Sequence, residues 1–134
     1  MNITVKKGFD EMNLPKVTAL LQSTYWADDR SKEQIEKSMK NSICVGAFNE
    51  EKEQIGFARV ITDHATTYYL CDVIVATEYR GHNVGSALLT AIVEDEELKD
   101  LRGILGTKDA HGFYANFGFE KNEKLFMQRW TKVL

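Results

Sequence analysis

The sequence predicts an α/β domain with a mixed, mostly antiparallel sheet of six to seven strands and about four flanking helices. Apolar residues recur with a strand period in some stretches and with a helix period in others, which indicates both kinds of element. A polar turn at residues 49–53 joins two strand patterns into a hairpin. Hairpins exclude a purely alternating, doubly wound fold, so the expected class is α+β with helices on the faces of the sheet.

Local signals place the elements along the chain. Pro15 stands near the start of a helical pattern, where its missing N–H is harmless. Ser31 followed by Gln34 has the form of a capping box and predicts a second helix. We expect strands at residues 3–6, 43–48, 55–61, 68–76, 102–107 and 125–133, and helices at 14–25, 32–39, 84–96 and 110–116.

Length and composition restrict the function classes. The 134 residues are too few for two well-packed domains, so we expect one domain over residues 1–134. Seventeen Lys and Arg against 20 Asp and Glu give a net charge of −3, which argues against nucleic acid as a partner. No apolar stretch approaches the ~20 residues of a membrane-spanning helix, so we expect no membrane partner.

The N-terminus carries charges where a signal peptide would need an apolar stretch, which predicts a cytoplasmic protein. In a reducing cytosol Cys44 and Cys71 are thiols, and each lies in an apolar run typical of a buried residue. No spacing of His, Cys and Asp predicts a metal site.

Residues 72–86 carry the strongest functional signal. An apolar strand, interrupted only by Asp72, leads through a glycine-containing loop into a helix. Such a junction presents unpaired N–H groups and the positive end of a helix dipole, both of which favour an anion. Gly81 and Gly85 can take positive φ and admit a ligand, and Arg80 adds a cation. Neither a dinucleotide fingerprint nor a nucleoside-triphosphate loop is present.

Two motifs in this chain resemble the GNAT superfamily of N-acetyltransferases. Arg80-Gly-His-Asn-Val-Gly85 is similar to its acyl-CoA loop, and the stretch from Ala110 to Phe119, with a Tyr four residues before Gly-Phe, is similar to its last motif. The order of the predicted helices and strands also fits this superfamily. The sequence outside these two motifs resembles a subgroup of small bacterial members of this superfamily, whose substrate is not settled.

The resemblance implies acetyl-CoA as cosubstrate and assigns residues to it. The pantetheine arm would pair with the backbone of Val73, Ile74 and Val75, and amides of the following loop would hold the pyrophosphate. One departure is Asn83, which stands where the family has glycine; asparagine tolerates the left-handed conformation, so we expect the loop to persist with weaker affinity. The expected cofactor-binding residues are Val73, Ile74, Val75, Arg80, Gly81, His82, Asn83, Val84, Gly85 and Ser86.

Catalytic roles also follow from the resemblance and from the chemistry. Tyr114 matches the residue that protonates the departing CoA thiolate, and the alternative is a Tyr packed at a helix edge. Asp72 is the carboxylate placed to accept a proton from the amine or to anchor it, but an Asp paired with Arg59 would look the same in sequence. Tyr25, Trp26 and Arg30 border the expected acceptor pocket, with rim or core packing as the alternative.

The sequence thus predicts direct attack of a primary amine on acetyl-CoA in a ternary complex, the amine belonging to a small cationic molecule or to a peptide or protein. A backbone N–H of residues 73–75 would stabilise the charge on the thioester oxygen. Two alternatives stay open: a non-catalytic acyl-CoA-binding module, which Asn83 favours, and acyl relay through Cys71. The edge strand expected at 125–133 could pair in a homodimer or remain alone.

Overall fold

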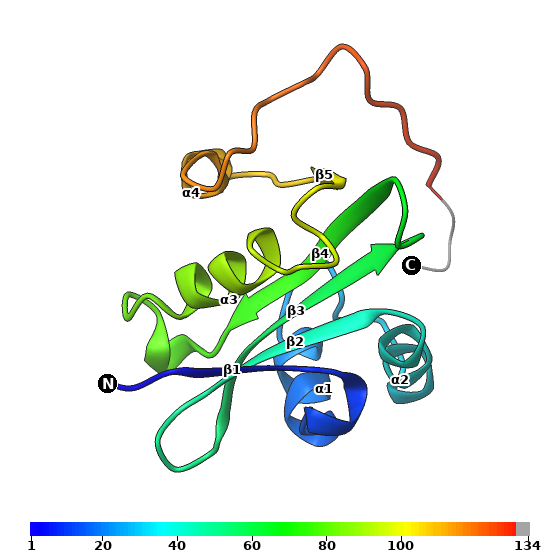
Figure 1. Cartoon of the computed structure of the whole chain (residues 1–134). Helices are drawn as coiled ribbons and strands as arrows, with labels where there is room; N and C mark the ends of the chain where they lie inside the picture. Colours follow the sequence, from blue (N-terminus) through cyan, green and yellow to red (C-terminus); the bar gives the residue numbers. More distant parts are fainter. Residues whose placement is uncertain (131–134) are drawn as a thin grey trace.

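The structure, a computed structural model that describes residues 1–130, is built on a five-stranded sheet (Figure 1). The strands lie side by side in the order of the sequence, and the first four are antiparallel. The fifth runs parallel to the fourth, because a helix separates the two. The strands are β1 (Thr4–Lys7), β2 (Ile43–Phe48), β3 (Gln54–Thr62), β4 (Thr67–Val75) and β5 (Arg102–Leu105).

Within residues 1–130, four α-helices accompany the sheet: α1 (Leu14–Gln22), α2 (Lys32–Lys40), α3 (Val84–Val93) and α4 (His111–Ala115). Two short 3-10 turns, η1 (Phe9–Glu11) and η2 (Thr77–Tyr79), precede α1 and α3. Side chains cap the first two helices, since Asn13 accepts from the amide of Lys16 and Ser31 accepts from the amide of Gln34. The capping signal predicted for α2 is thus present.

The core has one layer on each face of the sheet. On one face, residues of α1 and α2 such as Leu21 and Ile35 pack against Phe57 and Ile74. On the other, Leu88 and Ile92 of α3 pack against alternate residues of β2, β3 and β4. Strands covered on both faces lack a polar side, which explains the nearly continuous apolar sequence of β2 and β4.

The number of strands predicted from sequence is wrong for the described part of the chain, which has five rather than six or seven. Residues 125–130 of the expected last strand form no ladder, and residues 131–133 lie outside the described residues. The apolar pattern there is real, but a strand also needs a neighbour for its N–H and C=O groups. Four large side chains of this stretch are exposed: Leu125, Phe126, Met127 and Trp130.

Two helices also end earlier than predicted. Helix α1 ends at Gln22, and the buried Thr24 then accepts from the amide of Ala27, which turns the chain toward α2. Helix α3 ends at Val93, and Asp95 accepts from the amide of Glu97. Among residues 1–130 no helix has the length and apolar character needed to cross a membrane.

Close packing of α3 on the sheet depends on Gly56 of β3. A Cβ at this position would lie 2.9 Å from Val84 Cγ1 and 3.2 Å from Leu88 Cδ1. We expect Gly56→Ala to force α3 away from the sheet and to lower the free energy of unfolding by about 1–3 kcal/mol. Urea denaturation measures the change.

Gly112→Ala is the matched control, since a Cβ there meets nothing within 4 Å and alanine favours the helical state of α4. A Gly56→Ala protein as stable as the wild type would contradict this view of the contact between α3 and β3.

Candidate functional site

A β-bulge in β4 shapes the centre of the candidate site. Phe57 of β3 pairs with Ile74, whereas Arg59, two residues on, pairs with Cys71, so β4 carries one extra residue at this point. Asp72 lies in the bulge with φ 55°, in the left-handed region that Asp tolerates better than most residues. The parallel ladder to β5 ends just before it, at Leu70 and Leu105. Beyond this point the edge of β4 that faces β5 has no partner strand within residues 1–130.

Two arginines hold Asp72 in place. Arg59 Nε and an Arg30 guanidinium nitrogen each donate to Asp72 Oδ2 at 2.8 Å, and the Asp72 side chain is only 2% exposed. Arg59 also donates to Ser42 Oγ at 3.0 Å. Burial lowers the pKa of Arg59, but the charge and hydrogen bond of Asp72 outweigh it and leave that pKa above its ordinary value. The cluster carries a net charge of +1.

Backbone groups at the end of β4 point away from β3. The amide of Ala76 donates to Ile55 O at 2.8 Å across the antiparallel pair. Because peptide groups alternate in direction along a strand, the N–H and C=O of Val75 face the opposite edge. Arg80 Nε donates to Val75 O at 3.4 Å, which agrees with that direction. Val73 shares this edge, while the side chain of Ile74 enters the core.

The loop after η2 leads into α3 with a row of free amides. The amides of residues 81–86 donate to no acceptor within the described chain, and the first bonded amide is that of Ala87, which donates to Asn83 O. Asn83 is the N-cap with φ 64°, and its side chain makes no capping bond. This row of amides at a helix N-terminus can bind an anion. Asn83 adopts the left-handed conformation that we expected it to tolerate.

The two glycines of the loop have different roles. Gly81 has φ 83°, and a Cβ there would meet nothing within 4 Å, so its surroundings are open. Gly85 lies inside α3 and does not have positive φ, so that expectation is wrong for it. A Cβ on Gly85 would lie 3.3 Å from the Phe113 ring, so the glycine allows α4 to approach α3 closely. His82 and Ser86 occupy the same stretch, and Val84 is buried in the core.

Tyr114 lies in α4 and packs, partly buried, against the core layer that contains α3. Its ring makes edge-to-face contacts with Phe113 and Phe119, at centroid distances of 5.1 and 6.2 Å. Burial raises the pKa of its phenol, so the hydroxyl is protonated at neutral pH and can donate a hydrogen bond. The predicted catalytic residues thus come from two different elements, Tyr114 from α4 and Asp72 from the bulge of β4.

The residues expected at the acceptor side lie in the turn between α1 and α2. Tyr25 is 70% exposed and packs edge-to-face against Trp26 at 5.5 Å. The Lys108 ammonium, from the loop between β5 and α4, lies 5.5 Å from the centre of the Tyr25 ring. Arg30 reaches inward to Asp72 instead. No sequence pattern predicts the Tyr25–Lys108 contact or the pairing of Arg30 with Asp72.

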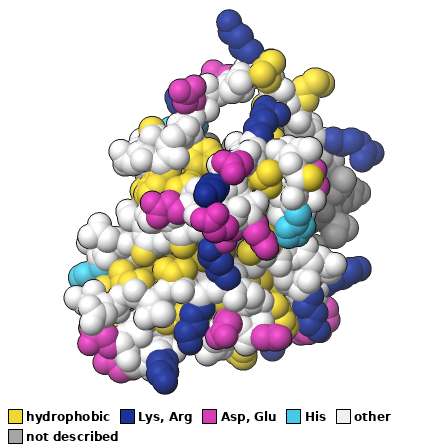
Figure 2. Space-filling view, viewed as in Figure 1, with side chains coloured by type: hydrophobic (Ala, Val, Ile, Leu, Met, Phe, Trp, Pro, Cys, Tyr) yellow, Lys and Arg dark blue, Asp and Glu magenta, His cyan; other side chains and the backbone are white. Residues whose placement is uncertain are grey.

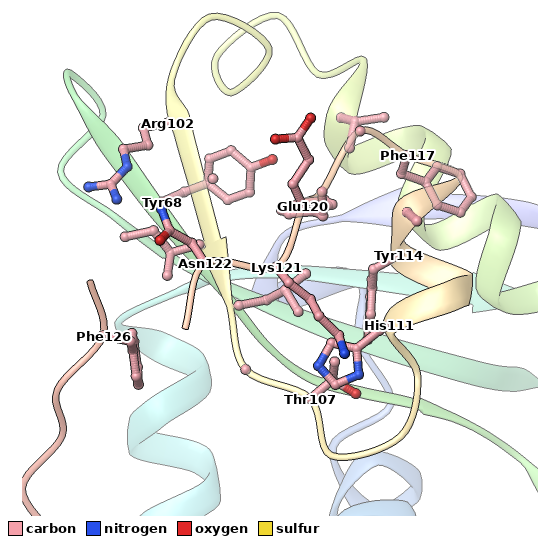
Figure 3. Close-up of a pocket in the computed structure, with 18 of the residues that line it drawn as sticks. Tyr68, Arg102, Thr107, His111, Tyr114, Phe117, Glu120, Lys121, Asn122 and Phe126 are labelled. Atoms are coloured by element: carbon pink, nitrogen blue, oxygen red, sulfur yellow. The ribbon is translucent and has the colours of Figure 1, made fainter. Parts of the chain in front are cut away.

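A hollow of about 1320 Å³ lies between β5, α4 and the segment that follows α4 (Figure 3). Tyr68, Tyr114 and Phe117 line it, together with polar side chains that include His111 and Lys121. None of the loop residues 81–86 lines it, so the hollow is separate from the row of free amides, although it includes Tyr114. Within residues 1–130 no group of three His, Cys, Asp or Glu side chains could hold a metal ion.

Comparison with known families identifies the fold. The family described as the acetyltransferase (GNAT) domain matches residues 40–121, which run from the end of α2 through α4 and cover more than half of the chain. The chain belongs to the GNAT acetyltransferase family. The resemblance seen in the two sequence motifs is therefore confirmed, and GNAT membership implies acetyl-CoA as cosubstrate.

Similar acetyltransferases come from plants and bacteria. The GCN5-related N-acetyltransferase 2, chloroplastic, of Arabidopsis thaliana is 32% identical over 86% of this chain and 46% of its own length. Histone acetyltransferase TAP1 of Glycine max is 32% identical over 86% of this chain and 48% of its own. The chain thus spans about half the length of these curated relatives. A solved structure assigned to the GNAT family, from Xanthomonas campestris pv. campestris, is 33% identical with a TM-score of 0.92, covering 100% of this chain and 96% of that one.

The thiol next to the bulge provides a test of the site's chemistry. Burial raises the pKa of Cys71 to about 11, so less than about one thiol in a thousand is ionised at neutral pH, and the thiolate is the nucleophile. We expect iodoacetamide to alkylate Cys71 slowly at pH 7 and the rate to keep rising about tenfold per pH unit beyond pH 9. Mass spectrometry of the Cys71 peptide measures this rate.

Cys44, also with a pKa raised to about 11 by burial, is the internal control, and circular dichroism at each pH confirms that the fold persists. A rate that levels off near pH 8, or an acetylated Cys71 after incubation with acetyl-CoA, would contradict this view and favour acyl relay through Cys71.

Proposed function

We propose that this protein is an acetyl-CoA-dependent N-acetyltransferase that transfers the acetyl group directly to a primary amine. One observation carries the proposal: the unpaired edge of β4 at Val73 and Val75 runs directly toward a row of free amides at the N-terminus of α3. An extended amide-bearing chain that ends in a pyrophosphate is complementary to such an arrangement. Bound acetyl-CoA supplies an activated thioester.

The residues present fit this cosubstrate. Amides of residues 81–86 would hold the pyrophosphate, and the open surroundings of Gly81 admit it close to the backbone. Arg80 is exposed, and its Nε lies 3.4 Å from Val75 O. Once it releases this contact, its guanidinium can bind a phosphate. The outward N–H and C=O groups of Val73 and Val75 would pair with the pantetheine amides. Asn83 supports the helix start with its left-handed backbone.

Tyr114 is proposed as the general acid. A CoA thiolate that leaves needs a proton or a strong hydrogen bond, and a thiol pKa of about 8.5 makes a phenol with its pKa of about 10 an adequate donor. The raised pKa keeps the Tyr114 phenol protonated across the neutral range. The edge-to-face contacts with Phe113 and Phe119 fix the direction of the ring.

For Asp72 the geometry supports the ion-pair alternative over the role of base. One carboxylate oxygen already accepts from both Arg59 and Arg30, and the side chain is almost completely buried. We propose that Asp72 positions the bulge of β4 and the turn between α1 and α2. An amine would then lose its proton to water near the acceptor side.

The acceptor is proposed to be a cationic amine, either a small molecule or a lysine or N-terminal amine of a peptide. The exposed Asp28 and Asp29 lie in the turn between α1 and α2, next to the exposed Tyr25 and Trp26. Carboxylates and aromatic faces both attract an ammonium group. The histone acetyltransferase name of the Glycine max relative supports a protein amine as one class to test.

Replacement of Tyr114 by phenylalanine tests the chemistry. We expect Tyr114→Phe to lower kcat about 100-fold at saturating amine, with KM for acetyl-CoA nearly unchanged, because a general acid contributes at least about 10²-fold. Release of CoA thiol with a panel of small amines and lysine peptides gives the rates.

Tyr68→Phe is the matched control, since it removes the hydroxyl of another tyrosine that lines the same hollow as Tyr114. A kcat of Tyr114→Phe within about twofold of the wild type would exclude the acid role. Binding of acetyl-CoA by calorimetry without thiol release on any amine would instead favour the non-catalytic acyl-CoA-binding module, which Asn83 suggested.

A further inference from the structure

A buried asparagine closes the turn between β2 and β3. Asn49 is only 6% exposed, whereas residues 50–53 of the same turn are exposed. Figure 2 shows acidic and basic side chains at the lower left, where this turn lies in Figure 1. The Asn49 Oδ1 atom accepts from the amides of Glu51 and Glu53, at 3.0 and 2.9 Å. The backbone of the turn thus uses only the oxygen of the Asn49 side chain and leaves its amide nitrogen for other partners.

The amide nitrogen of Asn49 reaches the 3-10 turn η2. Asn49 Nδ2 donates to the hydroxyl oxygen of Tyr79 at 3.0 Å, and a longer bond of 3.3 Å goes to Glu53 Oε1. Two backbone N–H groups point at the other terminal atom of the Asn49 side chain, so that atom is the oxygen and the nitrogen faces Tyr79. The bond therefore joins the β2–β3 turn to the segment that directly precedes the loop of free amides.

Residues 77–82 have few other hydrogen bonds. The backbone amides of Tyr79 and Arg80 each donate to the oxygen three residues earlier, and Arg80 Nε donates to Val75 O. All of these bonds are local. Within the described chain, the bond from Asn49 is thus the only hydrogen bond that joins residues 77–82 to a distant part of the sequence. The Tyr79 ring adds packing against the core.

Both ends of this loop are fixed on the first residues of β3. Before the loop, the amide of Ala76 donates to Ile55 O at 2.8 Å. After it, the buried Val84 lies so close to Gly56 that a Cβ on the glycine would be 2.9 Å from Val84 Cγ1. The bond to Tyr79 fixes a point between these two ends. Because fixing an inner point shortens the free span of a loop, it restricts the positions that the following amides can take.

We propose that Asn49 is a positioning residue for acyl-CoA binding, which acts through the Tyr79 hydroxyl to hold the amides of residues 81–86 toward one pyrophosphate. This inference rests on the proposed function, which assigns those amides to the pyrophosphate. A row of donors that is already in place binds its ligand with a smaller loss of conformational entropy. When the arrangement that can bind is populated only in part, the apparent affinity falls by the same fraction.

Calorimetric titration of the full chain with CoA tests the proposal. Tyr79→Phe removes the hydroxyl and keeps the ring in the core, and we expect it to raise the Kd for CoA about three- to tenfold, the effect of one hydrogen bond. The double variant Asn49→Ala/Tyr79→Phe should bind CoA no more weakly than Asn49→Ala alone, because both changes remove the same bond. Tyr79→Phe decides the question by itself where Asn49→Ala is too unstable to measure.

Asp63→Ala is the matched control. Asp63 accepts from three amides of the β3–β4 turn, at the opposite end of β3 from Gly56, so its loss loosens a comparable turn far from the loop. We expect the Kd for CoA of this variant to stay within about twofold of the wild type. An equal rise of the Kd in Asp63→Ala and Tyr79→Phe would show a general loss of stability and would overturn the positioning role.

NMR relaxation of the unliganded protein gives a second readout. In Tyr79→Phe the backbone order parameters of residues 79–83 should fall from about 0.85, typical of a rigid backbone, toward about 0.6. A Tyr79→Phe protein that binds CoA as tightly as the wild type, or whose loop is as rigid, would overturn the proposal and leave the proposed function intact. A wild type that binds no CoA would overturn the proposed function, and the role of Asn49 with it.

Discussion

The charge cluster at Asp72 is the constraint on which the rest of the site depends. A left-handed backbone at a residue with a Cβ costs free energy, of order 1–3 kcal/mol, and the extra residue of the bulge interrupts the ladder with β3. Two guanidinium groups on one buried carboxylate oxygen offset that cost. Removing the carboxylate would leave Arg30 and Arg59 facing each other without compensation in a poorly solvated place, so the bulge and the ion cluster support each other.

Two other parts of the site depend on the charge cluster at Asp72. The bulge lies where the ladder between β4 and β5 ends, so the backbone at Val73 and Val75 is left available to a ligand. Arg30 ties the turn between α1 and α2, which carries Tyr25 and Trp26, to Asp72 at the bulge of β4. On the other face, Gly56 and Gly85 let α3 lie close to the sheet and to α4, so the free amides at the start of α3 and the phenol of Tyr114 are held by packed elements.

Much of this arrangement could be predicted from the sequence, and the failures have physical causes. Local patterns in the sequence predicted the α-helices and the strands β1 to β5, because most of these elements bury an apolar face in the core. The strand prediction failed at residues 125–130, since a period of two shows that a segment suits a sheet but not whether a partner strand is present. Asp72 could be singled out in the sequence because a carboxylate is unusual in an otherwise apolar strand. Its partner Arg30, 42 residues away in sequence, could not be found by spacing, and neither could the bulge, which depends on the register between β3 and β4.

The central claim is that the end of β4 and the start of α3 together form the acyl-CoA site. An NMR titration of the ¹⁵N-labelled protein with CoA tests it most directly. The amides of Val73, Val75 and residues 81–86 should shift most, since these are the groups that the structure leaves without an acceptor. Shifts confined to the hollow beside β5, with the amides of residues 81–86 unchanged at saturating CoA, would contradict the account.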